Sequence, residues 1–189
     1  MSTKSFDLII YQLTRPLSYL RIKHDDKWIY DWLVPVIATA LTLTFIYFFI
    51  PLNNVVVKGG LIDEINSFVA NLPGFFIAAL AAVATFNKDD IDNLMASEPP
   101  KIEILHHGNP LMIKMTRRRF LCVLFSYLTA VSIFLVLLTK IGLAVELPTK
   151  YVVVASWVGS AAFFLVLWQM ILATLLGLYY LGERLHTPE

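Results

Sequence analysis

Four long stretches without Asp, Glu, Lys or Arg limit the fold of this chain more than any other feature. They run from Trp32 to Val57, Ile65 to Asn87, Phe120 to Thr139 and Tyr151 to Gly182. Each is at least as long as the roughly 20 residues that a helix needs to cross the hydrocarbon core of a bilayer. Because a backbone in lipid must satisfy its own hydrogen bonds, each stretch is expected to be helical. The spans are predicted near residues 33–50, 66–86, 120–139 and 152–178.

The composition agrees with an all-α protein embedded in a membrane as a single domain of residues 1–189. Hydrophobic residues make up 58% of the chain and charged residues 15%, whereas soluble domains carry roughly 25% charged residues. We therefore expect the excess apolar surface to face lipid. The net charge is only +1, so the bulk charge does not indicate direct binding to nucleic acid.

The second predicted span is less regular than the others. Asn71, Pro73 and Gly74 lie inside it, and sharp bends in helices usually occur at such residues, so we expect a kink. Before the kink, apolar residues between Leu61 and Leu72 repeat at helical spacing, which predicts an amphipathic entry at the outer interface. The fourth stretch rises about 1.5 Å per residue and is long enough to project beyond the bilayer.

The orientation follows from the distribution of Lys and Arg. Twelve of these residues lie before the first span, between the second and third, or after the fourth, while the alternate loops hold Lys58, Lys140 and Lys150. Cytoplasmic flanks are enriched in Lys and Arg. Both termini and the loop of residues 87–119 are therefore predicted to lie in the cytoplasm, as in a multi-pass protein of the inner (plasma) membrane.

Residues 1–32 are predicted to form a cytoplasmic segment at the membrane interface. Between residues 5 and 22, apolar side chains such as Phe6 and Ile10 recur on one side at helical spacing. Two interior charges make this stretch a poor span. We interpret it as an amphipathic helix on the inner membrane surface, with Pro16 as a candidate break.

Three carboxylates follow the second span closely, at Asp89, Asp90 and Asp92. Such a cluster can bind a divalent cation or a pyrophosphate–metal complex, and prenyl-transfer enzymes use aspartate pairs in this way. Those enzymes also need a second acidic cluster, and the other adjacent pair here is Asp25–Asp26 at an arbitrary spacing. We interpret the three carboxylates as a solvated helix end or as partners of the basic cluster before the third span.

That basic cluster lies directly before the third span, where anionic headgroups contribute about 1 kcal/mol per charge. Within residues 87–119, acidic side chains gather at one end and basic side chains at the other. This pattern favours a folded hairpin or a polar docking surface over a DNA-binding patch. The residues predicted to contact a partner or lipid headgroups are Lys114, Arg117, Arg118, Arg119, Asp89, Asp90 and Asp92.

No catalytic, cofactor or metal site is predicted. His106 and His107 are adjacent, so their side chains point apart, and a metal site that joins them to His24 or His186 is the weaker alternative. Cys122 is the single cysteine, which excludes an intrachain disulfide. The sequence also lacks a nucleophile-elbow serine, a phosphate-binding glycine loop and a zinc protease motif.

The predicted spans contain no Asp, Glu, Lys, Arg or His. Transporters, proton relays and voltage sensors keep such groups within the membrane, so these functions are disfavoured. Gly74, Ala78, Ala81 and Ala82 form small faces suited to close helix packing. We expect a homo-oligomer.

Three functions are compatible with these features. The first is a non-enzymatic scaffold or sensor that docks a cytosolic protein, because the cytoplasmic segments are too long for simple connections and too short for a separate domain. The second is a membrane-perturbing effector of the holin-like or abortive-infection kind. The third is a lipid-modifying membrane enzyme whose site includes the three aspartates or the adjacent histidines.

In its size and in the layout of its spans, with both ends inside, the whole chain resembles the KwaA family, the four-span membrane subunits of the bacterial Kiwa anti-phage system. No motif residue carries this resemblance, and no functional residue carries over. The resemblance implies an oligomer in the inner membrane, a cytosolic DNA-binding partner subunit and a role in sensing infection.

Overall fold

The computed structural model describes residues 3–24, 27–85, 89–95, 99–106, 109–146 and 148–182. These residues contain four helices that are long and apolar enough to cross a membrane, which confirms the predicted all-α class and the predicted number of such helices. Each of these helices begins a few residues before its predicted start, because flanking residues, charged ones among them, also adopt helical backbone. The span helices are Ile29–Phe49, Leu61–Thr85, Arg117–Ala144 and Thr149–Gly182.

The first span consists of two helical segments joined without a break. A π-helical segment, η2 (Ile29–Leu33), leads into α2 (Val34–Phe49). The helix ends where Ile50 adopts extended backbone. A short 3₁₀ helix, η3 (Leu52–Asn54), then begins the connection to the second span.

The second span bends at the predicted position. Its two helices, α3 (Leu61–Val69) and α4 (Leu72–Thr85), are separated by Ala70 and Asn71, directly before Pro73. Both α3 and α4 pack against α5 (Arg117–Ala144). The apolar side of α3 is therefore covered by protein along part of its length.

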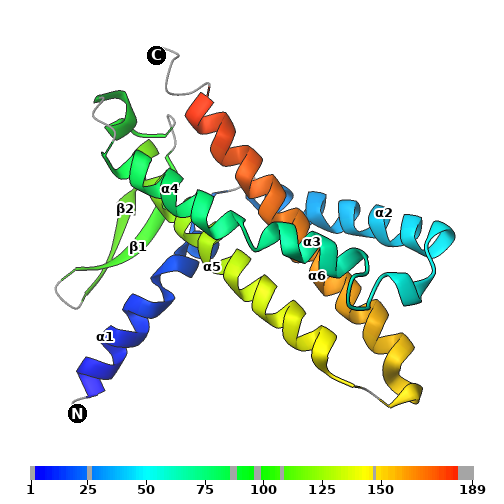
Figure 1. Ribbon diagram of the computed structural model, residues 1–189. Helices are drawn as coiled ribbons and strands as arrows, with labels where there is room; N and C mark the ends of the chain where they lie inside the picture. The colour runs from blue at the N-terminus through cyan, green and yellow to red at the C-terminus, as the bar shows by residue number, and fades with distance from the viewer. Residues whose placement is uncertain are drawn as a thin grey trace.

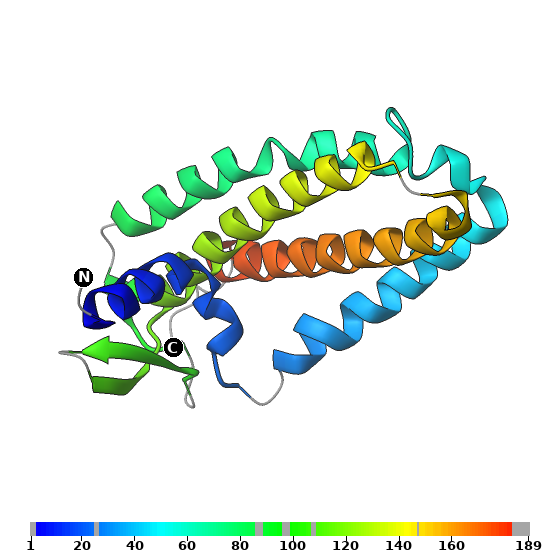
Figure 2. The ribbon, with the colours of Figure 1, turned by 90° about the horizontal axis from the view of Figure 1, so that it is seen from below.

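The four spans lie in an open row. α5 packs between α4 and α6 (Thr149–Gly182), and α2 packs against α6. Figure 1 shows α5 and α6 running side by side with α3 and α4 along them. In Figure 2, α2 and α6 converge at one end and separate toward the other. α2 consequently packs mainly along one helix, α6.

A β-hairpin lies at one end of the row, together with several short elements. We call this end the hairpin end and the opposite end the far end. Strands β1 (Lys101–His106) and β2 (Asn109–Lys114) pair antiparallel, with Lys101 opposite Lys114. The sequence predicted a folded hairpin in this loop but not its strands. The other elements at this end are α1 (Thr3–Thr14) and the 3₁₀ helices η1 (Arg15–Arg21) and η4 (Asp89–Asp92).

α1 leaves the row at the hairpin end and crosses the direction of α5 and α6 (Figure 1). The helical backbone changes to 3₁₀ at Arg15, with Pro16 in the first turn of η1. Exposed apolar side chains on α1 include Ile9, Ile10 and Leu13. This geometry is the one that an interfacial helix requires, because the helix lies across the spans and not along them.

The most buried side chains lie along α5. Leu121, Leu124 and Leu128 have no exposed surface, since α5 has helices on two sides. The buried layer continues under the hairpin through Ile91 and Ile102, which are also fully covered. The hairpin is thus attached to the ends of the spans by apolar packing.

Candidate functional site

The β-hairpin has one face on protein and one face open. Its side chains alternate along each strand, as the two-residue period of a strand requires. Ile102 is fully buried and anchors the inner face. The inner face includes Ile102, Ile104 and Ile113, and the open face includes Lys101, Glu103, Met112 and Lys114.

The outer edge of β1 is occupied by the segment that precedes the first span. The Lys23 N–H donates to the Lys101 carbonyl at 3.1 Å, and the Lys101 N–H donates to the Lys23 carbonyl at 3.4 Å. The Arg15 guanidinium adds a hydrogen bond to the Glu103 carbonyl at 3.3 Å. These bonds tie the N-terminal elements to the hairpin.

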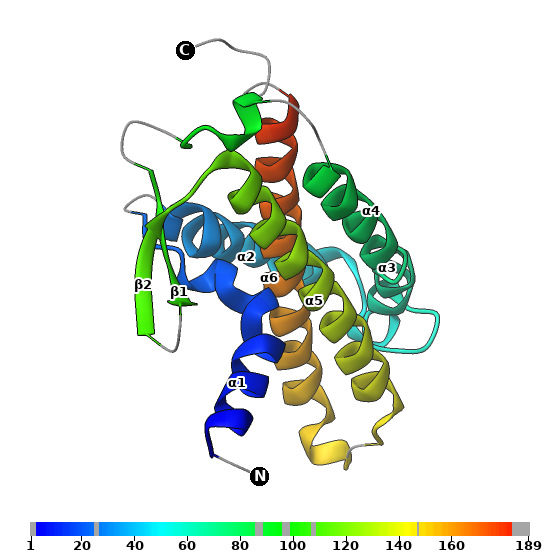
Figure 3. The same cartoon turned by 90° about the vertical axis from the view of Figure 1, so that its left-hand side faces the viewer.

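The outer edge of β2 is open. The Met115 N–H donates to the Pro100 carbonyl at 2.9 Å. Every second residue before Met115, namely Ile113 and Leu111, therefore also points its N–H and C=O groups toward β1. Because bonding alternates along an antiparallel ladder, the N–H and C=O groups of Met112 and Lys114 point away from β1. No described residue bonds to them. Figure 3 shows β2 on the outer side of the hairpin, away from the helices.

Arg118 connects three segments at the hairpin end. Its Nε and Nη2 donate to the two carboxylate oxygens of Asp92 at 2.8 and 2.9 Å. Its Nη1 donates to the carbonyls of Val83 and Ala84, at 3.1 and 3.2 Å. These carbonyls belong to the last turn of α4, which has no further helical N–H to bond. Arg118 therefore closes the end of α4 and holds η4 against α5.

The four predicted basic residues divide into two kinds. Arg117 is 3% exposed and lies within the protein, and the partly exposed Arg118 is paired with Asp92. Lys114 and Arg119 are exposed at the surface. The cations that remain for a partner or for lipid headgroups are thus Lys114 and Arg119, because the other two are already engaged in the fold.

The acidic cluster is also partly accounted for by the fold. Hydrogen bonds from Arg118 lower the pKa of the Asp92 carboxyl below its usual range. Asp92 thus pairs with a residue of the basic cluster, which is one of the two interpretations that the sequence offered. Asp89 and Asp90 contribute backbone to η4, and their side chains lie outside the described residues.

A second polar cluster joins η1 to the start of the first span, and the sequence did not predict it. The Tyr19 hydroxyl donates to a carboxylate oxygen of Asp31 at 3.0 Å, and Lys27 forms an ion pair with the same carboxylate. The Lys27 ammonium also lies 4.4 Å from the centre of the Tyr19 ring. Burial, and then the Asp31 charge, raises the pKa of the Tyr19 hydroxyl above its ordinary value.

Pro35 lies in the first turn of α2, and helical backbone already begins before it, at Ile29 in η2. Pro35 has no N–H, so it leaves the Asp31 carbonyl without its helical donor. The Gln169 side chain of α6 donates to this carbonyl at 2.8 Å. α6 is therefore bonded to the start of the first span.

The residues weighed for metal binding do not form a site among the described residues. No group of three or more His, Cys, Asp or Glu side chains gathers in that part of the chain. His106 is the last residue of β1, and its side chain is not described. His107 and His186 lie outside the described residues. Cys122 is partly buried in α5.

Comparisons with known proteins add no assignment. No family model matches the chain, and no curated protein and no solved structure matches it. Function is therefore argued from the chain's own geometry.

Proposed function

We propose that this protein is a non-enzymatic scaffold or sensor subunit of the inner (plasma) membrane, with both termini in the cytoplasm, that oligomerises and docks a cytosolic protein at its hairpin end. The Lys and Arg distribution supports this orientation. The resemblance to the KwaA family adds a role in anti-phage defence to the proposal.

The observation that carries the proposal is the open edge of β2. Two backbone N–H groups and two carbonyls, at Met112 and Lys114, face outward on a hairpin whose other edge is occupied. An extended segment of another protein can add to such an edge as a further strand. Met112 and Lys114 are both exposed, so they offer one apolar and one cationic contact to that segment.

A proline at the open edge tests the docking mode. Met112→Pro removes an outward N–H without removing a bond between β1 and β2, whereas Met112→Leu keeps the N–H and the apolar side chain. In affinity purification with mild detergent, one soluble protein should accompany the parent and Met112→Leu at equal amounts, and should be lost from Met112→Pro. Equal retention by all three variants, or no retained protein, would contradict docking at this edge.

The orientation has its own test. In a Cys122→Ser background, a membrane-impermeant thiol reagent added to intact cells should label Val57→Cys at the far end. It should label Lys101→Cys only after the membrane is permeabilised. The opposite pattern would place the hairpin outside the cytoplasm and remove the basis for a cytosolic partner.

Oligomerisation is supported by the small residues of α4. Gly74, Ala78, Ala81 and Ala82 are exposed on the side of α4 that other described elements leave uncovered. Small residues allow helices of neighbouring subunits to approach closely. Ala78→Leu should reduce the oligomer seen by cross-linking in membranes, while Ala40→Leu, an exposed alanine on α2, should not.

A membrane-perturbing effector is a second candidate, and one observation favours it. Only 17% of the most apolar window of the first span is buried within the chain. Such a helix is free to repack when copies gather. Overexpression of the chain alone should then collapse the membrane potential reported by a dye, whereas a scaffold should leave the potential unchanged.

A further inference from the structure

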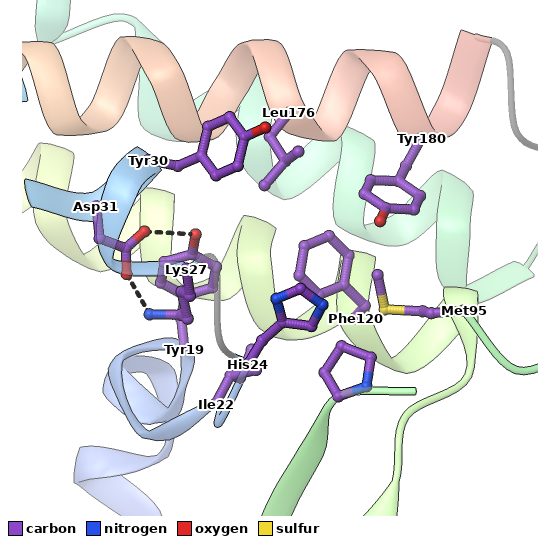
Figure 4. A pocket seen from close by; sticks show the side chains of 11 residues that line it. Tyr19, Ile22, His24, Lys27, Tyr30, Asp31, Met95, Phe120, Leu176 and Tyr180 are labelled. Carbon is purple, nitrogen blue, oxygen red and sulfur yellow. Dashed lines mark hydrogen bonds and ion pairs between the residues drawn. The ribbon is translucent and has the colours of Figure 1, made fainter. Parts of the chain in front are cut away.

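A pocket opens at the hairpin end, between the start of the first span and the end of α6. Its volume is about 110 Å³, and it is enclosed by η1, η2, α5, α6 and the chain before β1. Figure 4 shows the side chains around it. An engineered apolar cavity of about 150 Å³ binds benzene. The present pocket is smaller than that cavity, so it has room for at most one ring or a short length of one acyl chain.

Most of the pocket wall is apolar and aromatic. Phe120 of α5 and Tyr180 of α6 stand with ring centres 5.1 Å apart, and Leu176 of α6 lies one turn before Tyr180 (Figure 4). Phe120 is 5% exposed, so the wall that it forms is fixed by packing. Ligand sites commonly combine such a wall with a few placed polar groups.

The polar groups in the lining include His24 and the Lys27 ammonium with the residues that hold it. Asp31 and the Tyr19 ring engage two sides of this ammonium. An ammonium has three N–H donors. Asp31 already accepts from both Lys27 and Tyr19. The pocket thus presents one further donor to a ligand oxygen, next to an apolar wall.

The pocket lies where the first span meets the membrane surface. Tyr30 lines it, and Trp28, Tyr30 and Trp32 of the same helical segment are 57%, 53% and 55% exposed. Exposed Trp and Tyr at the end of a span mark the level of the lipid headgroups. Molecules with one polar end and one apolar chain are concentrated at that level.

We propose that this pocket binds a single-chain amphiphile of the membrane, such as a fatty acid or a lysophospholipid. The ligand's chain packs against Phe120, Leu176 and Tyr180, and an oxygen of its polar end accepts a hydrogen bond from Lys27. The volume leaves no room for two acyl chains side by side. The site is independent of the β2 edge, so it stands or falls separately from the proposed docking function.

Two neighbouring leucines of α6 provide a matched test. Leu176 lines the pocket, whereas Leu175 is 56% exposed on the outside of the helix. Leu176→Trp should fill the pocket and weaken binding of oleate and of oleoyl lysophosphatidylglycerol by at least about tenfold. Leu175→Trp should bind both as the parent does. Binding is measured by native mass spectrometry of the purified full chain in maltoside micelles.

A second pair of variants tests the polar contact. The parent should prefer oleate to oleyl alcohol, and Lys27→Met should lose that preference while Lys23→Met, an exposed lysine outside the pocket, keeps it. Leu176→Phe replaces Leu176→Trp if the larger variant does not elute as a folded protein. Unchanged affinity in both filled variants, or equal binding of a diacyl phospholipid, would overturn the proposal.

Discussion

The two ends of the helix row are organised in different ways. At the hairpin end, polar contacts join segments far apart in the chain, such as Arg118 to Asp92 and Gln169 to the Asp31 carbonyl. At the far end, Lys140 pairs with Asp63 while its own side chain stays 52% exposed. Polar contacts between distant segments are thus concentrated at the hairpin end, whereas the far end has this exposed pair and a bond from Asn66 to the Val136 carbonyl at 3.5 Å. We therefore expect partner and ligand binding at the hairpin end.

Two glycines of α6 test the difference in packing, and we expect the largest effect here. A Cβ at Gly177 would lie 3.0 Å from Leu124 Cδ2, whereas a Cβ at Gly159 meets no atom within 4 Å. Gly177→Leu should push α6 away from α5 and lower the free energy of unfolding by about 3 kcal/mol. Gly159→Leu should cause no loss. Both are measured by denaturation in mixed micelles.

Equal destabilisation by the two glycine variants would show that α6 is packed as tightly toward the far end as toward the hairpin end. The comparison between the ends would then fail for packing, although it could still hold for polar contacts.

The ion pairs at the two ends provide the second test. Arg118→Ala removes bonds to Asp92 and to two carbonyls of α4, so its thermal midpoint should fall by several degrees. Lys140→Ala removes one exposed pair, and exposed pairs contribute little, so its midpoint should hardly change. Circular dichroism of the purified variants measures both. Arg119→Ala, at the exposed neighbouring position, is the control for loss of a positive charge.

If Lys140→Ala lowered the midpoint as much as Arg118→Ala, the far end would depend on its ion pair as strongly as the hairpin end does. A fall of the same size in Arg119→Ala would mean that net charge, and not the bonds of Arg118, sets the midpoint.

The Tyr19–Asp31 contact gives a smaller effect with a defined pH dependence. Tyr19→Phe removes one hydrogen bond to a carboxylate and should cost about 1.5 kcal/mol at neutral pH. The pKa of Tyr19 is raised in the folded chain, chiefly by burial. The pKa of tyrosine in an unfolded chain is about 10. The advantage of the parent should therefore be complete below that pH and shrink as the pH rises above it.

Unfolding curves of the parent and Tyr19→Phe between neutral and strongly alkaline pH measure this difference. A constant difference across the range would contradict the raised pKa. A difference that grew with pH would mean that the hydroxyl is ionised more readily in the folded chain than in the unfolded one.

The spans and the kink could be predicted because their causes are local. Long runs without charge require a helix in lipid wherever they occur, and Pro73 marks the bend by its own chemistry. The strands of the hairpin could also have been found. Residues from Lys101 to Ile104 alternate between polar and apolar, and Gly108 follows soon after, which is the pattern of a strand before a turn.

The contacts of the candidate site could not be predicted in the same way. The spacing of Lys27 and Asp31 permits a helical ion pair, but nothing near Tyr19 in the chain indicates that its hydroxyl binds that carboxylate. The sequence offered pairing with the basic cluster as one of two interpretations of the acidic cluster. In the structure Arg118 forms the ion pair with Asp92, while Lys114 and Arg119 stay exposed. This choice depends on the direction in which α5 begins.

The sequence by itself determined that this chain has four helices able to cross a membrane, because the absence of charge over each span is a property of the local chain. The tertiary structure alone decided which polar groups meet at the hairpin end, which strand edge stays open and where a pocket forms. These outcomes depend on the relative placement of segments distant in the chain. That placement is set by packing along α5 and α6, not by the residues of any one segment.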